Sequence, residues 1–209
     1  MTDGSRGRLI ALEGIDGCGK STQAEMLASR LGALLTFEPG ATPLGGQLRG
    51  LLLESGLPPL SDRAEALLMA ADRAQHVAEV VAPALDAGTW VVTDRFSGST
   101  IAHQGYGRGL DLPELARLVD WATAGLRPDL TVLIEVPAVL AATRLPRGRS
   151  DRFEALGAAF HQRVADGFHR LAADDPETWT VVDGTGAADA VSESVWSAVR
   201  ERLGVPTGG

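Results

Sequence analysis

The sequence predicts a three-layer α/β fold, in which helices cover both faces of a parallel sheet. Three observations lead to this prediction. Short apolar runs bounded by turn residues recur along the chain, segments with helical spacing separate them, and the first run leads into a glycine-rich segment at residues 14–21. In open sheets of this kind, ligands bind at the carboxyl ends of the strands.

The individual elements follow from these patterns in chain order. Apolar runs typical of buried parallel strands occupy residues 8–13, 33–37, 89–93, 130–136 and 178–182. Helical spacing predicts helices over residues 21–31, 44–53, 61–87 with an interruption at Pro83, 112–124, 139–144, 152–173 and 187–203.

Composition predicts one domain over residues 1–209, with a short lid at residues 144–154 and a disordered tail at residues 206–209. The chain has 209 residues, of which 44% are hydrophobic and 22% charged. We expect a cytoplasmic protein without a membrane partner, because no apolar run approaches the roughly 18 residues of a membrane span and the N-terminus lacks a signal-peptide core. The net charge of −8 argues against a polynucleotide partner.

Lys20 is the only lysine, and it stands in a full match to the phosphate-binding pattern G-x-x-x-x-G-K-[ST] at residues 14–21. Glycines let the backbone wrap an anion at the positive end of the following helix. Lys20 is expected to neutralise β and γ phosphates, and Ser21 to hold Mg²⁺. The predicted ATP-binding residues are Gly14, Ile15, Asp16, Gly17, Cys18, Gly19, Lys20, Ser21 and Thr22.

A second candidate segment is the run at residues 90–95, where an apolar strand ends in Asp94 and Arg95. In a doubly wound sheet this end lies beside the glycine-rich loop. Asp94 then has the position of a carboxylate on the magnesium side, and Arg95 has the reach to clamp phosphates between which a group passes. A structural ion pair is the alternative interpretation of the Asp94–Arg95 step.

Arginines gather in the third candidate segment, at Arg144, Arg147, Arg149 and Arg152. Because Pro146 and Gly148 interrupt them, the segment is typical of a flexible lid that closes on a polyphosphate. Arg147 and Arg149 are candidates for the catalytic guanidinium that stabilises charge on the transferring group. The alternative is a solvated basic face.

With these motifs in order, the chain resembles bacterial thymidylate kinases, members of the P-loop nucleoside monophosphate kinase superfamily. The resemblance rests on EGIDGCGKSTQ at residues 13–23, EPGATPLG at 38–45, DRAQH at 72–76, DRFSGSTIAHQGYGRG at 94–109, RPDL at 127–130 and RGRSDRFE at 147–154. It implies a P-loop fold with a five-stranded parallel sheet, a homodimer, and transfer of the γ-phosphoryl of Mg·ATP to dTMP. From their length, we expect the helical stretches near residues 61–87 or 112–124 to form the dimer contact.

The resemblance also implies roles for residues that would bind the acceptor. Asp16 matches the carboxylate that holds the sugar 3′-hydroxyl, Arg73 the arginine that grips the acceptor phosphate, and Arg95 the one that bridges acceptor and donor phosphates. The remaining matches are base-site residues, namely Ser99, Thr100, Gln104 and Arg49.

Four departures from the family pattern concern acceptor recognition. Phe37 stands where arginine is usual, Met69 where a phenylalanine stacks on thymine, and Phe96 and His103 where tyrosines are usual. Met69 can still cover a ring face with its polarizable sulfur. For His103, a packed neutral histidine and a pH-sensitive sugar contact are both open.

The alternatives are a kinase for another nucleoside monophosphate and a nucleotide-binding paralogue without catalysis. A P-loop switch is disfavoured, because the chain has no Asn-Lys-x-Asp segment.

Overall fold

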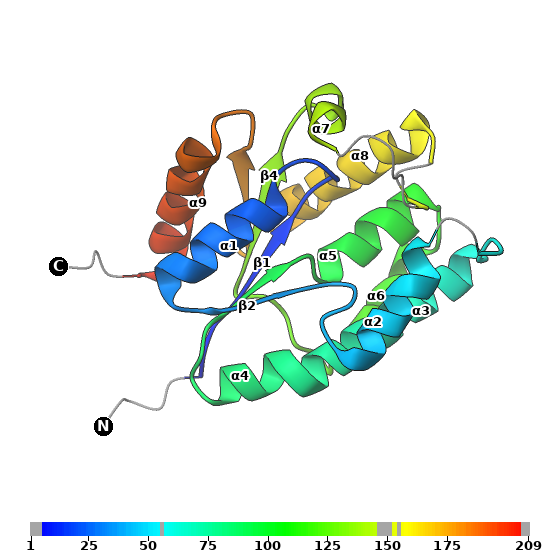
Figure 1. The fold of residues 1–209 in the computed structure, drawn as a ribbon, viewed down its shortest axis with the longest axis horizontal. Helices are drawn as coiled ribbons and strands as arrows, with labels where there is room; N and C mark the ends of the chain where they lie inside the picture. The colour runs from blue at the N-terminus through cyan, green and yellow to red at the C-terminus, as the bar shows by residue number, and fades with distance from the viewer. Residues whose placement is uncertain (1–5, 55–56, 146–151, 154–155, 206–209) are drawn as a thin grey trace.

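A single parallel sheet of five strands, in the order β2-β3-β1-β4-β5, forms the centre of the fold (Figure 1). The computed structural model describes residues 6–54, 57–145, 152–153 and 156–205. The strands are β1 (Leu9–Glu13), β2 (Leu34–Phe37), β3 (Val91–Asp94), β4 (Leu130–Glu135) and β5 (Trp179–Asp183). This confirms the predicted α/β fold with a five-stranded parallel sheet.

Helices lie on both faces of the sheet, as the apolar strand runs predict (Figure 1). The helices are α1 (Lys20–Leu31), α2 (Pro43–Leu53), α3 (Asp62–His76), α4 (Ala82–Asp86), α5 (Ser97–Thr100), α6 (Leu112–Ala122), α7 (Ala138–Arg144), α8 (Ala158–Asp174) and α9 (Ala188–Leu203), with π-helical segments η1 (Val77–Val81) and η2 (Ile101–Gly107). None of the described helices is long and apolar enough to cross a membrane.

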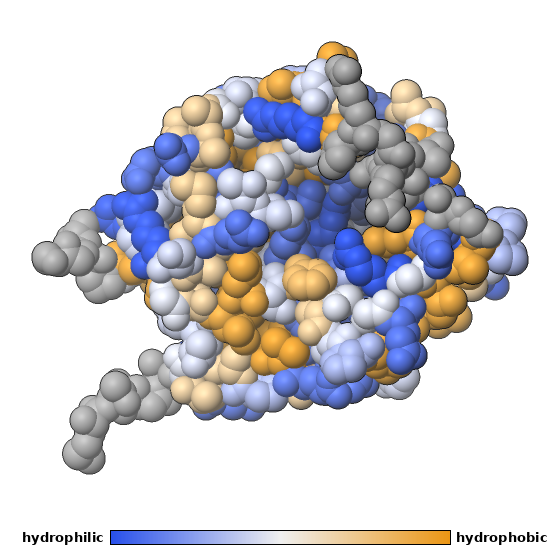
Figure 2. All heavy atoms as spheres, in the orientation of Figure 1, coloured by the Kyte–Doolittle hydropathy of each residue, from blue (hydrophilic) through white to orange (hydrophobic). Residues whose placement is uncertain are grey.

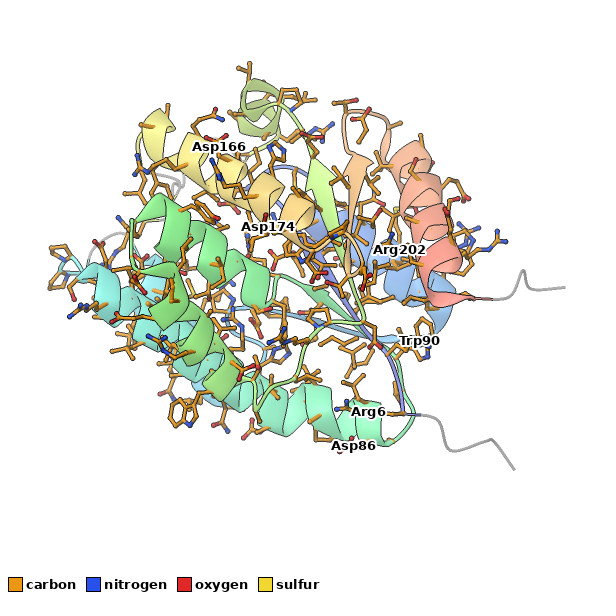
Figure 3. All side chains as sticks on the ribbon, turned by 180° about the vertical axis from the view of Figure 1, so that it is seen from behind. Arg6, Asp86, Trp90, Asp166, Asp174 and Arg202 are labelled. Atoms are coloured by element: carbon orange, nitrogen blue, oxygen red, sulfur yellow. The ribbon has the colours of Figure 1, made fainter. Side chains whose placement is uncertain are left out.

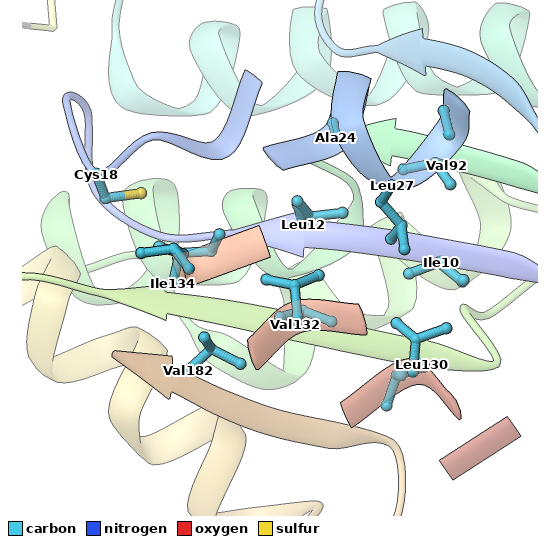
Figure 4. Close-up of a cluster of buried hydrophobic side chains, with 14 of the residues drawn as sticks. Ile10, Leu12, Cys18, Ala24, Leu27, Val92, Leu130, Val132, Ile134 and Val182 are labelled. Atoms are coloured by element: carbon cyan, nitrogen blue, oxygen red, sulfur yellow. The ribbon is translucent and has the colours of Figure 1, made fainter. Parts of the chain in front are cut away.

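Alternation along β1 divides its side chains between two cores. Ile10 and Leu12 pack against α1 and α9 in the larger core, which Figure 4 shows together with residues of β4 and β5. Leu9 and Ala11 face the other way, against η1 and α4. All five residues of β1 are buried, so this strand and the loop that follows it rest on a rigid support.

The predicted interruption of the 61–87 helix takes a different form from a break at Pro83. α3, η1 and α4 follow one another directly, with helical backbone angles at both junctions. Proline lacks an N–H and its ring crowds the carbonyl four residues earlier, so the wider turns of η1 accommodate Pro83, which is the second residue of α4. The backbone N–H of Ala82 accordingly bonds to the carbonyl of Val77, five residues back.

One helix prediction was wrong around the candidate site, and one helical segment was missed. The helix predicted from Arg152 begins only at Ala158, after Gly157. The segment α5–η2 was not predicted, because its glycines have low helix propensity. Packing overrides that propensity: a Cβ on Gly98 would lie 2.7 Å from the Trp179 ring, and one on Gly107 would lie 2.6 Å from the Phe160 ring.

Both ends of the described chain are fastened near the amino ends of the strands, where Figure 3 labels Arg6, Asp86 and Arg202. Arg6 pairs with Asp86 at the end of α4, with Nε 3.3 Å from Oδ1. Arg202 of α9 donates to the carbonyls of Glu177 and Trp179 at 2.8 and 3.1 Å. The carboxyl ends of the strands are thereby left for the candidate site.

Candidate active site

The glycine-rich loop between β1 and α1 is tightly curved and closely packed. Gly17 has φ +80°, in the left-handed region, and a Cβ there would lie 2.3 Å from the carbonyl oxygen of Ala141. Lys20 begins α1 and is buried, and its Nζ donates to the carbonyl of Ile15 across the loop at 2.8 Å. The ammonium is therefore held over the loop, where it can meet an anion.

This loop forms one wall of a cavity, which we call the loop cavity. Of the predicted ATP-binding residues, those that line it are Asp16, Gly17, Gly19, Lys20, Ser21 and Thr22. Cys18 instead packs in the larger core, and Gly14 and Ile15 border a separate hollow beside β4 and α8. The loop cavity also includes Asp94, Arg95 and Arg144.

Ser21 and Asp94 bring two side-chain oxygens together at the loop cavity. Ser21 Oγ donates to Asp94 Oδ2 at 2.5 Å. Asp94 Oδ1 is buried without a hydrogen-bond partner among the described residues. A hydroxyl and a carboxylate suit Mg²⁺, which takes one or two protein oxygens and completes its shell with water and phosphate. The predicted pair therefore fits a magnesium ion.

A second cavity, the inner cavity, lies next to the loop cavity. It is lined by Asp16, Glu38, Pro39, Arg49, Leu53, Met69, Asp72, Arg73, Arg95, Ser99, Thr100, His103, Gln104 and Phe153. Asp16, Glu38, Arg49 and Arg95 line both cavities. Figure 2 shows a hollow with a hydrophilic floor on the face where the phosphate loop and α5 lie in Figure 1.

Arg95 and Asp16 form an ion pair at the junction of the two cavities. Burial alone would raise the pKa of Asp16, but the charges of Arg95 and Lys20 outweigh burial and hold the pKa well below its usual range. Arg95 Nη1 also donates to Ser99 Oγ at 2.9 Å. The pair is thus a charged, fixed bridge between the phosphate loop and α5.

Sequence reasoning missed Glu13, which holds the turn that carries Arg95. Arg95 has φ +71°, a strained angle for a residue with a side chain. Glu13 Oε1 accepts from the backbone N–H groups of Phe96 and Ser99 at 3.0 and 2.9 Å, and Oε2 accepts from Ser99 Oγ at 2.6 Å. Burial raises its pKa despite the charge of Arg95 and these donors. The signal in the sequence that could have identified Glu13 is a carboxylate at the end of an apolar strand.

Arg73 is buried at the inner cavity and is oriented by three hydrogen bonds. Nε donates to Glu38 Oε2 at 2.8 Å, Nη1 to Thr100 Oγ1 at 2.7 Å, and Nη2 to the carbonyl of Phe96 at 2.9 Å. A guanidinium has five N–H donors. Two of them remain uncommitted among the described residues, so Arg73 can still bind an anion.

His76, to which sequence reasoning gave no chemistry, supports Arg73 through Glu38. The imidazole is fully buried. Its Nδ1 lies 2.8 Å from Glu38 Oε1, so Nδ1 donates to the carboxylate, and its Nε2 lies 2.7 Å from Thr36 Oγ1. Beside this network, burial and the charge of Glu38 raise the pKa of Asp72, which accepts from the N–H of Gly40.

His103 lies in an aromatic setting at the wall of the inner cavity. Its ring makes edge contacts with Phe168 and Phe153, at centroid distances of 5.9 and 6.1 Å. Burial and the charge of Arg95 lower its pKa to about 3. His103 is therefore neutral at physiological pH, and Nδ1 donates to the carbonyl of Ser99 at 2.9 Å.

Two of the four departures, Phe37 and Phe96, do not themselves line the inner cavity, although each ring lies beside an arginine that does. Phe96 is fully buried in the core beside β1, and the Arg73 guanidinium carbon lies 5.7 Å from its ring centroid. Phe37 lines the loop cavity and is 44% exposed, with the Arg49 guanidinium carbon 5.9 Å from its ring centroid. Met69 and His103 do line the inner cavity.

Only the ends of the arginine-rich segment can be placed. Arg144 donates to the carbonyl of Gly184 at 3.0 Å and borders the loop cavity. Arg152 donates to the carbonyls of Leu57 and Pro58 at 3.0 and 2.9 Å, so it fastens the loop after α2. Arg147 and Arg149, the predicted catalytic lid arginines, lie outside the described residues.

Known proteins match this chain over most of its length. A family model described as "Thymidylate kinase" matches residues 12–195. A thymidylate kinase of Synechococcus sp. (strain CC9902) is 48% identical and covers 94% of this chain and 99% of its own. One of Cupriavidus metallidurans is 48% identical over 89% of this chain and 94% of its own.

A solved structure supports the same relationship. The crystal structure of thymidylate kinase from Ehrlichia chaffeensis superposes with a TM-score of 0.78 at 30% identity, over 93% of this chain and 99% of that one. The family model, the curated relatives and the solved structure agree with one another, and the chain belongs to the thymidylate kinase family of enzymes.

Proposed function

We propose that the chain transfers the γ-phosphoryl group of ATP to dTMP, giving dTDP and ADP. The observation that carries this proposal is the pair of adjoining cavities that share Asp16 and Arg95. Two nucleotides bound on either side of these residues would have their phosphates within reach of one guanidinium. Positioning and charge stabilisation are the main demands of phosphoryl transfer.

The loop cavity is the proposed donor site. Lys20 would neutralise the β and γ phosphates of ATP from its place over the loop. Ser21 and Asp94 would hold Mg²⁺, with the buried Asp94 Oδ1 as an available ligand atom. When bound, the ion spreads negative charge away from the transferring group. Arg147 and Arg149 are proposed to add a guanidinium from the lid.

The inner cavity is the proposed acceptor site. The two uncommitted N–H groups of Arg73 would bind the phosphate of dTMP, and Asp16 would accept from the sugar 3′-hydroxyl. The phosphates of two bound nucleotides would repel the carboxylate of Asp16. Its ion pair with Arg95 and a hydrogen bond from the sugar hydroxyl would offset this repulsion, which accounts for an aspartate at this junction.

The proposed base site lies along the same wall of the inner cavity. Ser99, Thr100, Gln104 and Arg49 are the proposed base-site residues, and Met69 would cover a ring face.

Another deoxynucleoside monophosphate is the second candidate acceptor. The observation that favours it is the pair Met69 and His103 in the cavity wall, where the family pattern has aromatic residues.

We also propose a cytoplasmic homodimer, in which residues 1–209 act as one kinase domain. The cytoplasm is proposed because the proposed reaction consumes ATP and a nucleoside monophosphate, which are cytoplasmic metabolites. Leu67 of α3 is 58% exposed and borders a shallow hollow with Leu110 and Leu118, and Trp121 of α6 is 82% exposed. Apolar surface of this kind on adjacent helices supports an interface between two copies.

Transfer itself tests the function. The enzyme would be incubated with γ-³²P-labelled ATP, dTMP and MgCl₂, and the nucleotides separated. We expect label in dTDP, ADP in equal amount, and no dTDP when EDTA replaces magnesium. Release of labelled phosphate at a rate independent of dTMP would reject the proposal.

A matched pair of variants assigns the activity to the junction. Arg95→Gln should lower kcat by about 100-fold or more, because it removes a charge that meets both phosphates. Arg127→Gln alters an arginine whose side chain is 83% exposed and should leave kcat unchanged.

A further inference from the structure

Gln104 lines the inner cavity, and the orientation of its side-chain amide is fixed by Glu65, a residue that does not line the cavity. The Gln104 side chain is buried on η2, and Nε2 donates to Glu65 Oε1 at 3.0 Å. Its Oε1 has no hydrogen-bond partner among the described residues. An amide has two faces of opposite hydrogen-bonding character, so whatever fixes its orientation decides what the cavity offers a ligand.

Glu65 itself is held in place by Arg108. Arg108 Nε and Nη2 donate to Glu65 Oε1 and Oε2 at 3.1 and 2.7 Å, a two-point pair. Glu65 is 1% exposed, and the Arg108 guanidinium carbon lies 5.1 Å from the centroid of the Phe160 ring. The carboxylate cannot rotate away without breaking buried contacts.

An ionised carboxylate accepts hydrogen bonds and cannot donate them. If the Gln104 amide turned over, Oε1 would face a Glu65 oxygen, and two acceptors would oppose each other in a buried place. Glu65 therefore keeps Nε2 on its own side, and Oε1, an acceptor, is left without a partner among the described residues of the cavity.

We propose that Glu65 is a positioning residue for base selection, which fixes Gln104 so that its oxygen accepts from the N3–H of a pyrimidine-2,4-dione. Thymine and uracil carry a hydrogen on N3. Cytosine carries a lone pair there, which Gln104 Oε1 repels. The inference rests on the proposed function of the inner cavity as the acceptor site.

The variant that tests this is Glu65→Gln, whose amide can either donate to or accept from Gln104 and so releases its orientation. The assay compares kcat/KM for dTMP, dUMP and dCMP with saturating ATP. We expect the dTMP to dCMP ratio to fall by about tenfold or more, because a fixed acceptor opposite N3 is lost. The dTMP to dUMP ratio, which reports the 5-methyl contact, should stay within about twofold.

Two further variants separate this effect from a loss of structure. Glu65→Asp keeps the charge beside Arg108 but withdraws the carboxylate from Gln104 by one methylene, and it should lower the dTMP to dCMP ratio as well. If thermal melting shows that Glu65→Gln does not fold, Glu65→Asp takes its place in the test. Asp62→Asn removes the exposed second partner of Arg108, 3.6 Å from Nε, and should leave both ratios unchanged.

Unchanged dTMP to dCMP ratios in the folded Glu65 variants would overturn the inference, as would equal falls in both ratios. Neither result affects the proposed function while the unmodified enzyme phosphorylates dTMP. Failure of the unmodified enzyme to use dTMP would instead count against the function itself.

Discussion

Ser21 and Asp94 belong to different strand–helix units, and their side chains meet, with Ser21 Oγ donating to Asp94 Oδ2 at 2.5 Å. The contact exists because β1 and β3 are neighbours in the sheet, with Leu12 opposite Asp94. The residue after the glycine-rich loop and the residue at the end of β3 are thereby brought to one place. Two oxygens of the kind that Mg²⁺ takes as ligands therefore lie side by side.

Asp94→Asn should lower kcat by about 100-fold and raise the magnesium concentration needed for half-maximal rate, because a neutral amide is a weaker ligand for Mg²⁺. Initial rates over a magnesium titration measure both effects. Asp86→Asn, on α4 beside Arg6, is the control and should behave as the unmodified enzyme. A normal magnesium dependence in Asp94→Asn would remove Asp94 from the proposed ion site.

Lys20→Ala should lower kcat by about 1,000-fold or more, because no other lysine exists to neutralise the donor phosphates. The fold should persist, since the lost bond from the charged Nζ to the Ile15 carbonyl is worth about 1.5–3 kcal/mol, below the roughly 5–15 kcal/mol by which a folded domain is stable. Steady-state rates and thermal melting check the two statements separately. Near-normal turnover in a folded variant would remove the proposed mechanism.

His76→Leu should raise KM for dTMP by about tenfold with a smaller change in KM for ATP, because Glu38 loses a donor and no longer fixes Arg73. The free energy of unfolding should fall by about 1–3 kcal/mol, the usual cost of a buried acceptor left unpaired. His169→Leu is the matched control, since His169 makes an exposed pair with Glu135. Equal changes in both KM values would contradict a specific role at the acceptor phosphate.

The low pKa of His103 predicts a loss of stability in acid. Its pKa is lowered to about 3 in the folded chain, against about 6.5 in the unfolded chain. Between these values only the unfolded chain binds the proton, so the contribution of His103 is complete above pH 6.5 and decreases as pH falls. From pH 7.5 to 5.0 the loss is about 2 kcal/mol.

His103→Phe isolates this contribution, because it keeps a ring in place and removes the titrating group. Urea unfolding of both proteins at pH 7.5 and 5.0 gives the comparison. The difference in unfolding free energy should move by about 2 kcal/mol in favour of the variant at the lower pH. A difference that does not change with pH would show that His103 titrates normally in the folded chain.

Much of the architecture could be predicted because local patterns carry it. The five apolar runs became the five strands within two residues at each end. The phosphate loop followed from its glycine spacing, and the meeting of Asp94 with Ser21 followed from the expectation that their strands lie side by side. These features depend on periodicity and on topology, both of which are visible in the sequence.

The parts that could not be predicted depend on long-range contacts. Glu13, Glu38 and His76 acquire their roles only when β1, β2 and α3 are brought together around Arg95 and Arg73. No spacing rule connects such residues. The same holds for Phe96, whose position beside the motif arginine indicated the site but whose ring is buried in the core.

The acceptor panel tests the central claim most directly. With saturating Mg·ATP, kcat/KM would be measured for dTMP, dUMP, dCMP, dAMP, dGMP and UMP using the unmodified enzyme. The account predicts the highest value for dTMP, with dCMP and the purine nucleotides far below it. A higher value for any other acceptor, or no transfer to any of them, would contradict it.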